Sequence, residues 1–494
     1  MLFIAFCWSK YFLACYLGGS ASHGRPMELF LKELYDRGHT VAFCSTEENQ
    51  KQITLVPYRS LGPSPISSDV MKRAIERDSA EDLVTGFKEE KRNYFDLFYD
   101  YGYTGISTLI NDQRPDLILC DILADGCIDA AYENNVEYAI SSFIIGLGGL
   151  YDYPYTPSLL SPTLLRDMGF IDRFLKTWYY FPQLLAVYYP LIHSLNQERI
   201  RMGLSIVNSP AERLENKLML LNTLPGLEYN VELPPTIGQL GPVLPPITDT
   251  LDSKVSNWLD KQDKVAYMAF GSMSYLFPKQ LKALFEGLRC TGLSVLFASK
   301  FFNITDYNQG DLKDVYHVKW AQQRLILKND KVVLFVSHGG IESMHESIEA
   351  IVPLLIKPFF GDQILNARKI KNARIGDFIA DKYAFTSTDI CTMTNTLLND
   401  IETTVNLYKL HDLLMLKAKT NIQEAADYLE YVADHGTAMI TTTYQSLGLL
   451  ARGNYDVLIL GYMILILSLV FVGFISYKVV KLGCHLIAKK PKQE

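Results

Sequence analysis

The chain has 494 residues, of which 48% are hydrophobic and 20% are charged, and its formal net charge is −7. This length exceeds the size at which a single hydrophobic core stops growing, so two domains are expected. The acidic balance argues against nucleic acid as the main partner, because phosphate binding requires a clustered basic surface.

The N-terminal half alternates between apolar runs and amphipathic helices. The predicted elements are a strand at 11–17, a loop at 18–26, a helix at 27–36, a strand at 41–44 and a strand at 116–120. A further helix is expected through Ala131. This strand–helix–strand order is typical of a parallel sheet with helices on its faces.

A Pro-rich boundary separates this half from a second one like it. Residues 233–250 contain five prolines, which remove backbone donors and fix the chain, so we expect a linker rather than a helix or strand. The alternation then restarts, with predicted strands at 265–270, 294–298, 332–336 and 353–356 and predicted helices at 278–288 and 341–350.

The sequence therefore predicts an α/β fold in which two Rossmann-like domains face each other across a cleft. The expected boundaries are an N-terminal domain at 1–238, a linker at 239–262 and a C-terminal domain at 263–440. The eight cysteines form no Cys-x-x-Cys pair, which predicts neither a zinc site nor a disulfide framework and leaves the redox compartment undecided. Cys120 and Cys127 lie in apolar runs, so we expect both to be buried free thiols.

A transmembrane helix is predicted at 457–477, where 21 residues carry no charge. A helix of that length rises about 30 Å, which is enough to cross the hydrocarbon core of a bilayer. A buried core helix is the alternative. Five lysines occur in the tail at 478–494, so the positive-inside bias predicts a cytosolic tail and a body on the opposite side of the membrane.

The two ends of the chain bear on the same topology. Leu2–Trp8 resembles the apolar region of a signal peptide, but no basic residue precedes it. Lys490 and Lys492 form a K-x-K-x-x arrangement that resembles the dilysine retrieval signal of endoplasmic reticulum membrane proteins. Lysines that merely hold the tail in the cytosol are the alternative. We expect a single-pass type I protein of the endoplasmic reticulum with a luminal body.

Polar residues follow several predicted strands, namely His23, Asp121, Ser272, His338 and Asp362. In open parallel sheets, ligands bind outside the carboxyl ends of the strands, beside helix N-termini that attract anions. The turn His338-Gly339-Gly340 opens a helix, and its two glycines let backbone N–H groups approach a phosphate. Taken alone, such a turn is more often a helix cap.

A longer pattern surrounds this turn. The segment from Trp320 to Gln363 resembles the signature of the UDP-glycosyltransferase (UDP-glucuronosyltransferase-like) family. The matching positions are Trp320, Gln323, Leu327, Phe335, His338, Gly340, Ser343, Glu346, Pro353, Pro358, Asp362 and Gln363. The resemblance extends to RGHTVAF at 37–43 and to the single membrane span near the end of the chain.

The resemblance implies a GT-B-type fold and an inverting enzyme that moves a hexosyl or glucuronosyl group from a UDP-sugar to a hydroxyl. It implies that Trp320 stacks on uracil, with Gln323 beside the nucleoside, and that Glu346 binds the ribose hydroxyls. It implies that His338, Gly340 and Ser272 hold the diphosphate. Asp362 and Gln363 would bind the sugar, and Ser343 would belong to the same donor site. No metal or other cofactor is expected, because protein groups neutralise the leaving diphosphate in this family.

The catalytic residues implied by the resemblance are His23, in the motif SHGRP, as the base and Asp121 as its partner. Histidine suits a base because its unperturbed pKa of about 6.5 lies near working pH. A carboxylate on its other nitrogen fixes the tautomer and stabilises the imidazolium. Asp125 is a nearby rival for the partner, and a turn-capping histidine with a helix-capping aspartate is the structural alternative.

The chain also departs from the family pattern. Gln322 replaces proline, Asn329 replaces histidine and Ile351 replaces glycine. Glu342 occupies a position close to the diphosphate where many relatives carry a small residue or asparagine. A carboxylate there would repel phosphate unless it turned to solvent or paired with a cation. A catalytically degenerate relative that binds UDP-sugar or a partner protein, and a related epimerase, are therefore alternatives.

The acceptor is less well specified. The apolar, aromatic stretch from Phe143 to Tyr189 favours a small lipophilic molecule such as a sterol, lipid or phenol, although a Tyr-rich stretch is more often core. The choice between UDP-glucose and UDP-glucuronate stays open, since the sequence identifies no single arginine as the partner of the glucuronate carboxylate.

Overall fold

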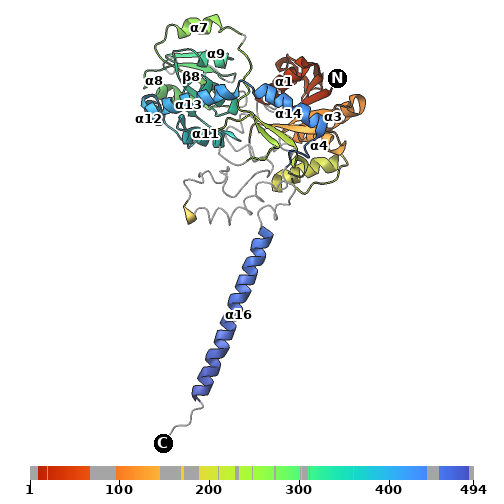
Figure 1. The fold of residues 1–494 in the computed structure, drawn as a ribbon. Coiled ribbons are helices and arrows are strands. Elements are labelled where there is room, and N and C mark those ends of the chain that lie inside the picture. Colours follow the sequence, from red (N-terminus) through yellow and green to blue (C-terminus); the bar gives the residue numbers. More distant parts are fainter. Residues whose placement is uncertain are drawn as a thin grey trace, which may run out of the picture. The chain divides into compact units, whose positions relative to one another are not determined.

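The structure is a computed structural model. It describes residues 9–18, 21–66, 96–144, 169–171, 189–209, 211–228, 233–247, 249–271, 274–300, 302, 310, 312–359, 361–441 and 455–488. These residues fall into two compact units, Met1–Thr437 and Ala438–Glu494. The larger unit contains two α/β domains, each built on a parallel sheet (Figure 1).

The N-terminal domain is built on a seven-stranded sheet in the order β3-β2-β1-β4-β5-β6-β7. Every neighbouring pair in it is parallel. Its strands are β1 (Tyr11–Cys15), β2 (Thr40–Ser45), β3 (Tyr58–Ser60), β4 (Leu117–Asp121), β5 (Tyr138–Ser142), β6 (Leu218–Leu221) and β7 (Ile237–Gln239). Because helices cover parallel sheets on both faces, these strands read as continuous apolar runs.

The helices of this domain are α1 (Ala21–Asp36), α3 (Tyr99–Gln113), α4 (Asp125–Glu133) and the short α6 (Ala211–Leu214), with 3-10 turns at Glu47–Gln52 and Asp96–Phe98. Helices α3 and α4 pack closely because α4 contains Gly126. A Cβ atom at Gly126 would lie 2.2 Å from the Tyr99 carbonyl oxygen, so no larger residue fits between these helices.

The C-terminal domain is built on a six-stranded parallel sheet in the order β10-β9-β8-β11-β12-β13. Its strands are β8 (Val265–Ala269), β9 (Ser294–Ala298), β10 (Val315–Val318), β11 (Val332–Ser337), β12 (Leu354–Ile356) and β13 (Gly376–Phe378). Its helices are α7 (Ser253–Leu259), α8 (Pro278–Arg289), α9 (Gln323–Leu327), α10 (Ile341–Glu349), α11 (Gln363–Asn372), α12 (Ser387–Asn399) and α13 (Ile401–Lys417). Alternate residues of β12 enter different cores, with Leu354 and Ile356 on one face and Leu355 on the other.

Helix α14 (Asn421–His435) returns to the N-terminal domain, although the predicted C-terminal domain at 263–440 includes it. It packs against α1, β4 and β6. Arg37, directly after α1, donates to Asp427 at 2.6 Å and to Glu430 at 2.8 Å, and the His39 ring lies 2.8 Å from Glu430. The buried face of α14 therefore packs on elements of the N-terminal domain.

Two local expectations were wrong. Residues 18–26 were expected to be a loop, but α1 begins at Ala21, so His23 lies in the first turn of that helix. Residues 233–250 were expected to be a linker without elements, but they contain β7, and α7 follows at Ser253. Among the described strands β7 pairs with β6 alone, and proline is tolerated beside such an edge strand because few of its backbone donors are needed.

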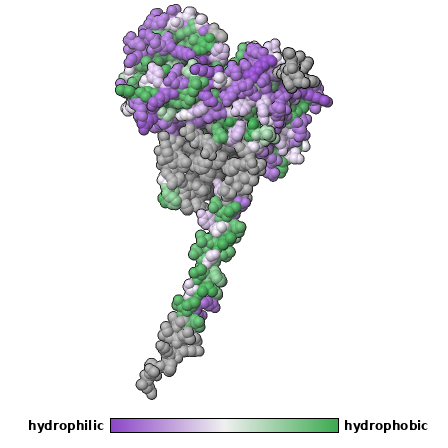
Figure 2. Space-filling model, viewed as in Figure 1, coloured by the Kyte–Doolittle hydropathy of each residue, from purple (hydrophilic) through white to green (hydrophobic). Residues whose placement is uncertain are grey.

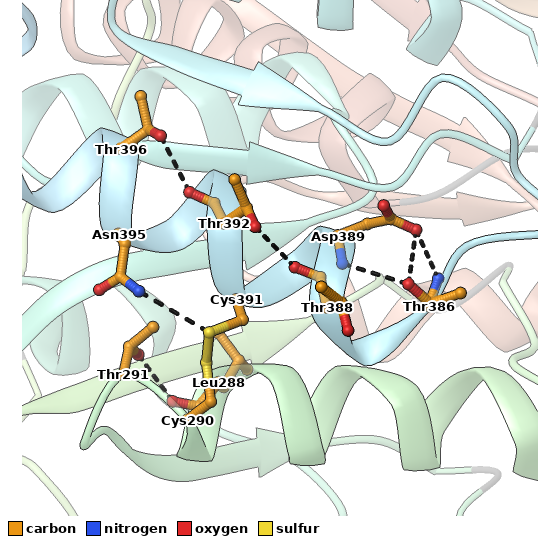
Figure 3. The surroundings of a disulfide bond; sticks show 10 residues. All are labelled: Leu288, Cys290, Thr291, Thr386, Thr388, Asp389, Cys391, Thr392, Asn395 and Thr396. Atoms are coloured by element: carbon orange, nitrogen blue, oxygen red, sulfur yellow. Dashed lines mark hydrogen bonds between the residues drawn. A yellow bond between two sulfur atoms is a disulfide. The ribbon is translucent and has the colours of Figure 1, made fainter.

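The expectation of free thiols at Cys120 and Cys127 was also wrong. Cys120 in β4 forms a disulfide with Cys127 in α4, and Cys290 forms another with Cys391. The second bond joins the end of α8 to α12 across 101 residues of sequence (Figure 3). Neither disulfide follows a recognisable cysteine spacing motif. The pairings depend on the tertiary fold, so the sequence did not predict them.

The smaller unit contains the helix α16 (Tyr455–Ala488). Within its segment Tyr455–Leu482, an 18-residue window has a mean hydropathy of 2.8 and is unburied, which makes the segment a candidate membrane span by length and composition. Figure 2 shows a nearly continuous hydrophobic surface along this helix. The predicted span at 457–477 lies within it. Leu2–Trp8, Lys490, Lys492 and most of the stretch from Phe143 to Tyr189 lie outside the described residues.

Candidate active site

His23 and Asp121 lie together at the carboxyl edge of the N-terminal sheet. His23 Nδ1 is 2.9 Å from Asp121 Oδ2, and both side chains are largely buried. The other carboxylate oxygen, Asp121 Oδ1, accepts a hydrogen bond from the Leu123 backbone N–H at 3.0 Å. These two contacts fix the carboxylate and orient the imidazole, so that its Nε2 is the nitrogen left to exchange a proton with a ligand.

The surroundings of His23 come from both domains. The Phe143 ring packs edge-on against the His23 ring at a centroid distance of 4.4 Å. Burial lowers the pKa of His23, but the charge and hydrogen bond of Asp121 raise it, as do the charges of Asp362 and Glu342. The resulting pKa lies above the ordinary histidine value of 6.5. Asp362 and Glu342 belong to the C-terminal domain, so the protonation of His23 depends on both halves of the site.

Asp125, the rival partner, lies elsewhere. It begins α4, and its carboxylate accepts a hydrogen bond from Arg213 at 2.7 Å. Arg213 also reaches Asp129, which pairs with Arg199 at 2.6 Å. Asp125 therefore belongs to a separate ion network with Arg213, Asp129 and Arg199.

The turn His338-Gly339-Gly340 joins β11 to α10, as the sequence indicated. The imidazole of His338 packs against two glycines: a Cβ atom at Gly340 would lie 2.5 Å from His338 Nε2, and one at Gly271 would lie 3.0 Å from it. Gly339 has a φ of 88°, a conformation that favours glycine. Burial lowers the pKa of His338 to about 4, so the ring is neutral near pH 7.

Gln323, Ser343 and Glu346 form a connected group beside this turn. The Gln323 amide donates to Ser343 Oγ at 3.1 Å and to Glu346 at 2.5 Å, and its oxygen lies 3.3 Å from the Tyr267 hydroxyl. Burial and the charge of Glu342 raise the pKa of Glu346 to about 8, against lowering contributions from Gln323, Arg25 and Arg324. This carboxyl is therefore poised to give or accept hydrogen bonds near neutral pH.

Asp362 and Gln363 begin α11 at the same edge of the sheet. Asp362 accepts a hydrogen bond from Asn366 at 2.7 Å, and Asn366 also donates to the Gly339 carbonyl at 2.9 Å. Burial raises the pKa of Asp362, while the charges of Lys369 and His23 oppose that shift. Asn366, which the sequence analysis missed, thus links the Asp362 loop to the glycine turn.

Trp320 lies apart from this tightly bonded group. Its side chain follows β10 and is 68% exposed, which leaves an indole surface open for stacking. Ser272 lies outside the described residues.

The departures from the family pattern have local explanations. Gln322 holds the segment before α7, accepting from the Asp252 N–H and donating to the Thr250 carbonyl, each at 2.8 Å. Asn329 accepts from the Lys331 N–H at 3.0 Å in the turn before β11. Ile351 adopts a φ of 58°, the left-handed region where glycine costs least, so this position carries backbone strain.

Glu342 pairs with a cation from the other domain. Arg25, two residues after His23 on α1, donates a hydrogen bond to the Glu342 carboxylate. Arg25 stands in the motif SHGRP, but only the fold brings it to the start of α10. The site therefore gathers a histidine–carboxylate pair, a glycine-rich helix start and several hydroxyl-binding groups, which suits transfer of a group carried on a phosphorylated ligand.

Comparisons with known proteins agree with this arrangement. The family model described as "UDP-glucoronosyl and UDP-glucosyl transferase" matches residues 198–494. The chain is 26% identical to a UDP-glycosyltransferase of Talaromyces amestolkiae over 79% of this chain and 80% of that protein. It is also 26% identical to the UDP-glycosyltransferase stmC of Aspergillus ustus, over 74% of this chain and 76% of that protein.

Two solved structures share the fold. The kitacinnamycin glycotransferase superposes with a TM-score of 0.59 and 17% identity, covering 86% of this chain and 99% of that one. Phytolacca americana UGT2, complexed with UDP-2fluoro-glucose and pterostilbene, superposes with a TM-score of 0.58 and 19% identity over the same shares. The two parallel sheets are thus those of the GT-B fold. With the family model covering more than half of its length, the chain belongs to the UDP-glycosyltransferase family and is a UDP-dependent glycosyltransferase.

Proposed function

We propose that the enzyme transfers a hexosyl or glucuronosyl group to a hydroxyl of a small lipophilic acceptor, with inversion of the anomeric centre. His23 Nε2 takes the acceptor proton as the acceptor oxygen attacks the anomeric carbon and the bond from that carbon to UDP breaks. Asp121 holds the ring and stabilises the imidazolium that forms. The observation that carries this proposal is the 2.9 Å contact between His23 Nδ1 and Asp121 Oδ2.

The donor site proposed for the UDP-sugar lies on the C-terminal domain. His338 and the N–H groups at the start of α10 would hold the diphosphate, where the helix dipole favours negative charge. Glu346, beside Gln323 and Ser343, would bind the ribose, and the exposed face of Trp320 would stack on uracil. Asp362 and Gln363 would bind the sugar. The mutual electrostatic influence of Asp362 and His23 supports a sugar between them. The proposal needs no metal ion.

The lipophilic acceptor is supported by an aromatic ring beside the proposed base. Phe143 contacts the His23 ring, and it is the first residue of the aromatic stretch Phe143–Tyr189 in the sequence. The similar fold of Phytolacca americana UGT2 holds pterostilbene together with a UDP-sugar analogue, which supports a related class of acceptor here.

We also propose that the enzyme is a type I membrane protein of the endoplasmic reticulum with a luminal catalytic body. The candidate span in α16 and the lysines that follow it support a cytosolic tail. The disulfides Cys120–Cys127 and Cys290–Cys391 support a body in an oxidising compartment, where such bonds persist.

The test is release of UDP by the detergent-solubilised protein, supplied with UDP-glucose or UDP-glucuronate and a panel of lipophilic alcohols and phenols. We expect acceptor-dependent release with one of the two donors. His23→Ala should abolish release while UDP still binds by calorimetric titration. His435→Ala, which alters an exposed histidine in α14, is the matched control and should retain full activity. A His23→Ala enzyme with an unimpaired rate would overturn the assignment of the base.

A further inference from the structure

Arg25 and Glu342 form an ion pair between the two domains, directly beside the proposed donor site. Arg25 lies in α1 two residues after His23, and Glu342 is the second residue of α10. The side chains are 39% and 24% exposed, so a ligand can reach either partner. Arg25 lies on α1, the helix that carries the proposed base His23. Glu342 lies on α10, the helix that follows the glycine turn.

Glu342 adds negative charge where a diphosphate would bind. The N–H groups at the start of α10 attract anions, but the Glu342 carboxylate lies in that first turn. Its charge is felt at neighbouring groups, since it raises the pKa of both Glu346 and His23. The Glu342 carboxylate would therefore repel a diphosphate that enters this position. Among the described residues bonded to Glu342, Arg25 is the one cation that offsets this repulsion.

We propose that Arg25 is a donor-positioning residue that Glu342 holds in place until the diphosphate of the UDP-sugar becomes its partner. The inference rests on the proposed donor site. A guanidinium has five N–H donors in a planar fork that matches phosphate oxygens, so it can exchange a carboxylate for a diphosphate without losing charge-assisted hydrogen bonds. Because Arg25 and His23 share one helical turn, this exchange would set the base against the anomeric carbon of the bound donor.

A purely structural ion pair makes a different prediction from this exchange. If the pair only held the domains together, removing either partner would break the same contact and would change UDP affinity in the same direction. If Arg25 binds the diphosphate, the two substitutions act oppositely. Loss of Arg25 removes a ligand group, whereas loss of the Glu342 charge removes both repulsion and a competitor.

The experiment is calorimetric titration of UDP into the detergent-solubilised full chain and its variants. We expect Arg25→Met to weaken UDP binding about tenfold or more, the scale of a lost charge-assisted hydrogen bond. Arg25→Lys, which keeps the charge, should recover part of that loss. Glu342→Gln should tighten UDP binding by about threefold or more, the upper scale for a partly exposed charge. Melting temperatures within a few degrees of the unchanged protein would establish that each variant is folded.

Arg37→Met is the matched control. Arg37 follows the same helix and pairs with Asp427 and Glu430 of α14, away from the glycine turn, so its loss should leave UDP affinity unchanged. Changes of the same sign in Arg25→Met and Glu342→Gln would overturn the exchange and leave a structural contact. UDP binding by Arg25→Met as tight as that of the unchanged protein would also overturn the exchange, but the proposed donor site would stand. Absence of UDP binding by the unchanged protein would overturn the donor site itself.

Discussion

Replacing Asp121 with asparagine should disable the proposed base, His23, without changing the shape of the site. Asp121 Oδ1 accepts from the Leu123 N–H, and Oδ2 faces His23 Nδ1. In Asp121→Asn the side-chain oxygen keeps its bond to Leu123, so the amide nitrogen faces the imidazole and donates to Nδ1. The ring proton then moves to Nε2, and that nitrogen can no longer accept the acceptor's proton.

The loss can be estimated from the contact that disappears. A hydrogen bond to a charged group contributes about 1.5–3 kcal/mol, which corresponds to roughly 10- to 150-fold in kcat/KM. The wrong tautomer adds to this, so we expect a loss of about 100-fold or more. The acid side of the pH profile should also move. A base must be neutral, so activity falls as pH drops through its pKa. Asp121 raises the pKa of His23, and burial alone lowers it, so the variant should lose activity at lower pH than the unchanged enzyme.

The assay is the initial rate of UDP release as a function of pH, with UDP affinity measured in parallel by calorimetry. Asp112→Asn, which neutralises an exposed carboxylate on α3 of the same domain, controls for the change in net charge and should have no effect. An Asp121→Asn enzyme that kept both its rate and its acid limb would refute the pairing of Asp121 with the catalytic base. Loss of UDP binding together with activity would show instead that the substitution damages the fold.

Three further predictions concern stability. Cys290→Ser with Cys391→Ser opens a loop of 101 residues and should lower the free energy of unfolding by about 2–4 kcal/mol, measured by urea unfolding of the body without reductant. Asp129→Ala removes the carboxylate that the buried guanidinium groups of Arg199 and Arg213 share, and it should cost about 3–5 kcal/mol by the same measurement. A cost below about 1 kcal/mol would refute the network. Burial raises the pKa of Glu346 from 4.5 to about 8, so the native state holds a proton that the unfolded chain has lost between these values. Unfolding free energy should therefore fall as pH rises across that interval, and Glu346→Gln should flatten the slope.

Much of the core of both sheets could be predicted from the sequence, because most of the central strands are apolar runs followed by an amphipathic helix. Strands β1, β2, β4, β8, β9, β11 and β12 lie within a residue or two of their expected positions. The central strands β5 and β6 were missed, and so were the edge strands β3, β7, β10 and β13. The edge strands have three or four residues each and lack a sustained apolar pattern, since among the described strands each of them pairs on one side only. The return of α14 to the first domain was missed as well, because its periodicity predicts a helix and says nothing of which core it covers.

The candidate site was predicted to the extent that its residues follow strands or open helices. His23 and Asp121 were named from the motif and the strand end, and the structure brings them within hydrogen-bond distance. Arg25 and Asn366 were not assigned, because their relevance lies in contacts across 317 and 27 residues of sequence. Single-sequence periodicity does not carry such long-range pairings. Glu342 shows the same limit: its charge conflicts with a diphosphate until its partner on the other domain is known.

The two domains supply different groups to the site, and acidic residues of the second domain influence the pKa of His23 in the first. The first domain supplies the histidine on α1 and its carboxylate on β4. The second supplies the glycine turn and two carboxylates, Glu342 and Asp362, whose charges raise the pKa of His23. A bound donor would lie among these groups and would add the charge of its diphosphate to theirs. The strength of the proposed base would therefore depend on whether the donor is bound, since Asp362 and Glu342, which would lie beside the donor, also stabilise the protonated imidazole. In this arrangement Arg25 is the cation that lies closest in sequence to the base, and its pairing with Glu342 already joins the two halves of the site.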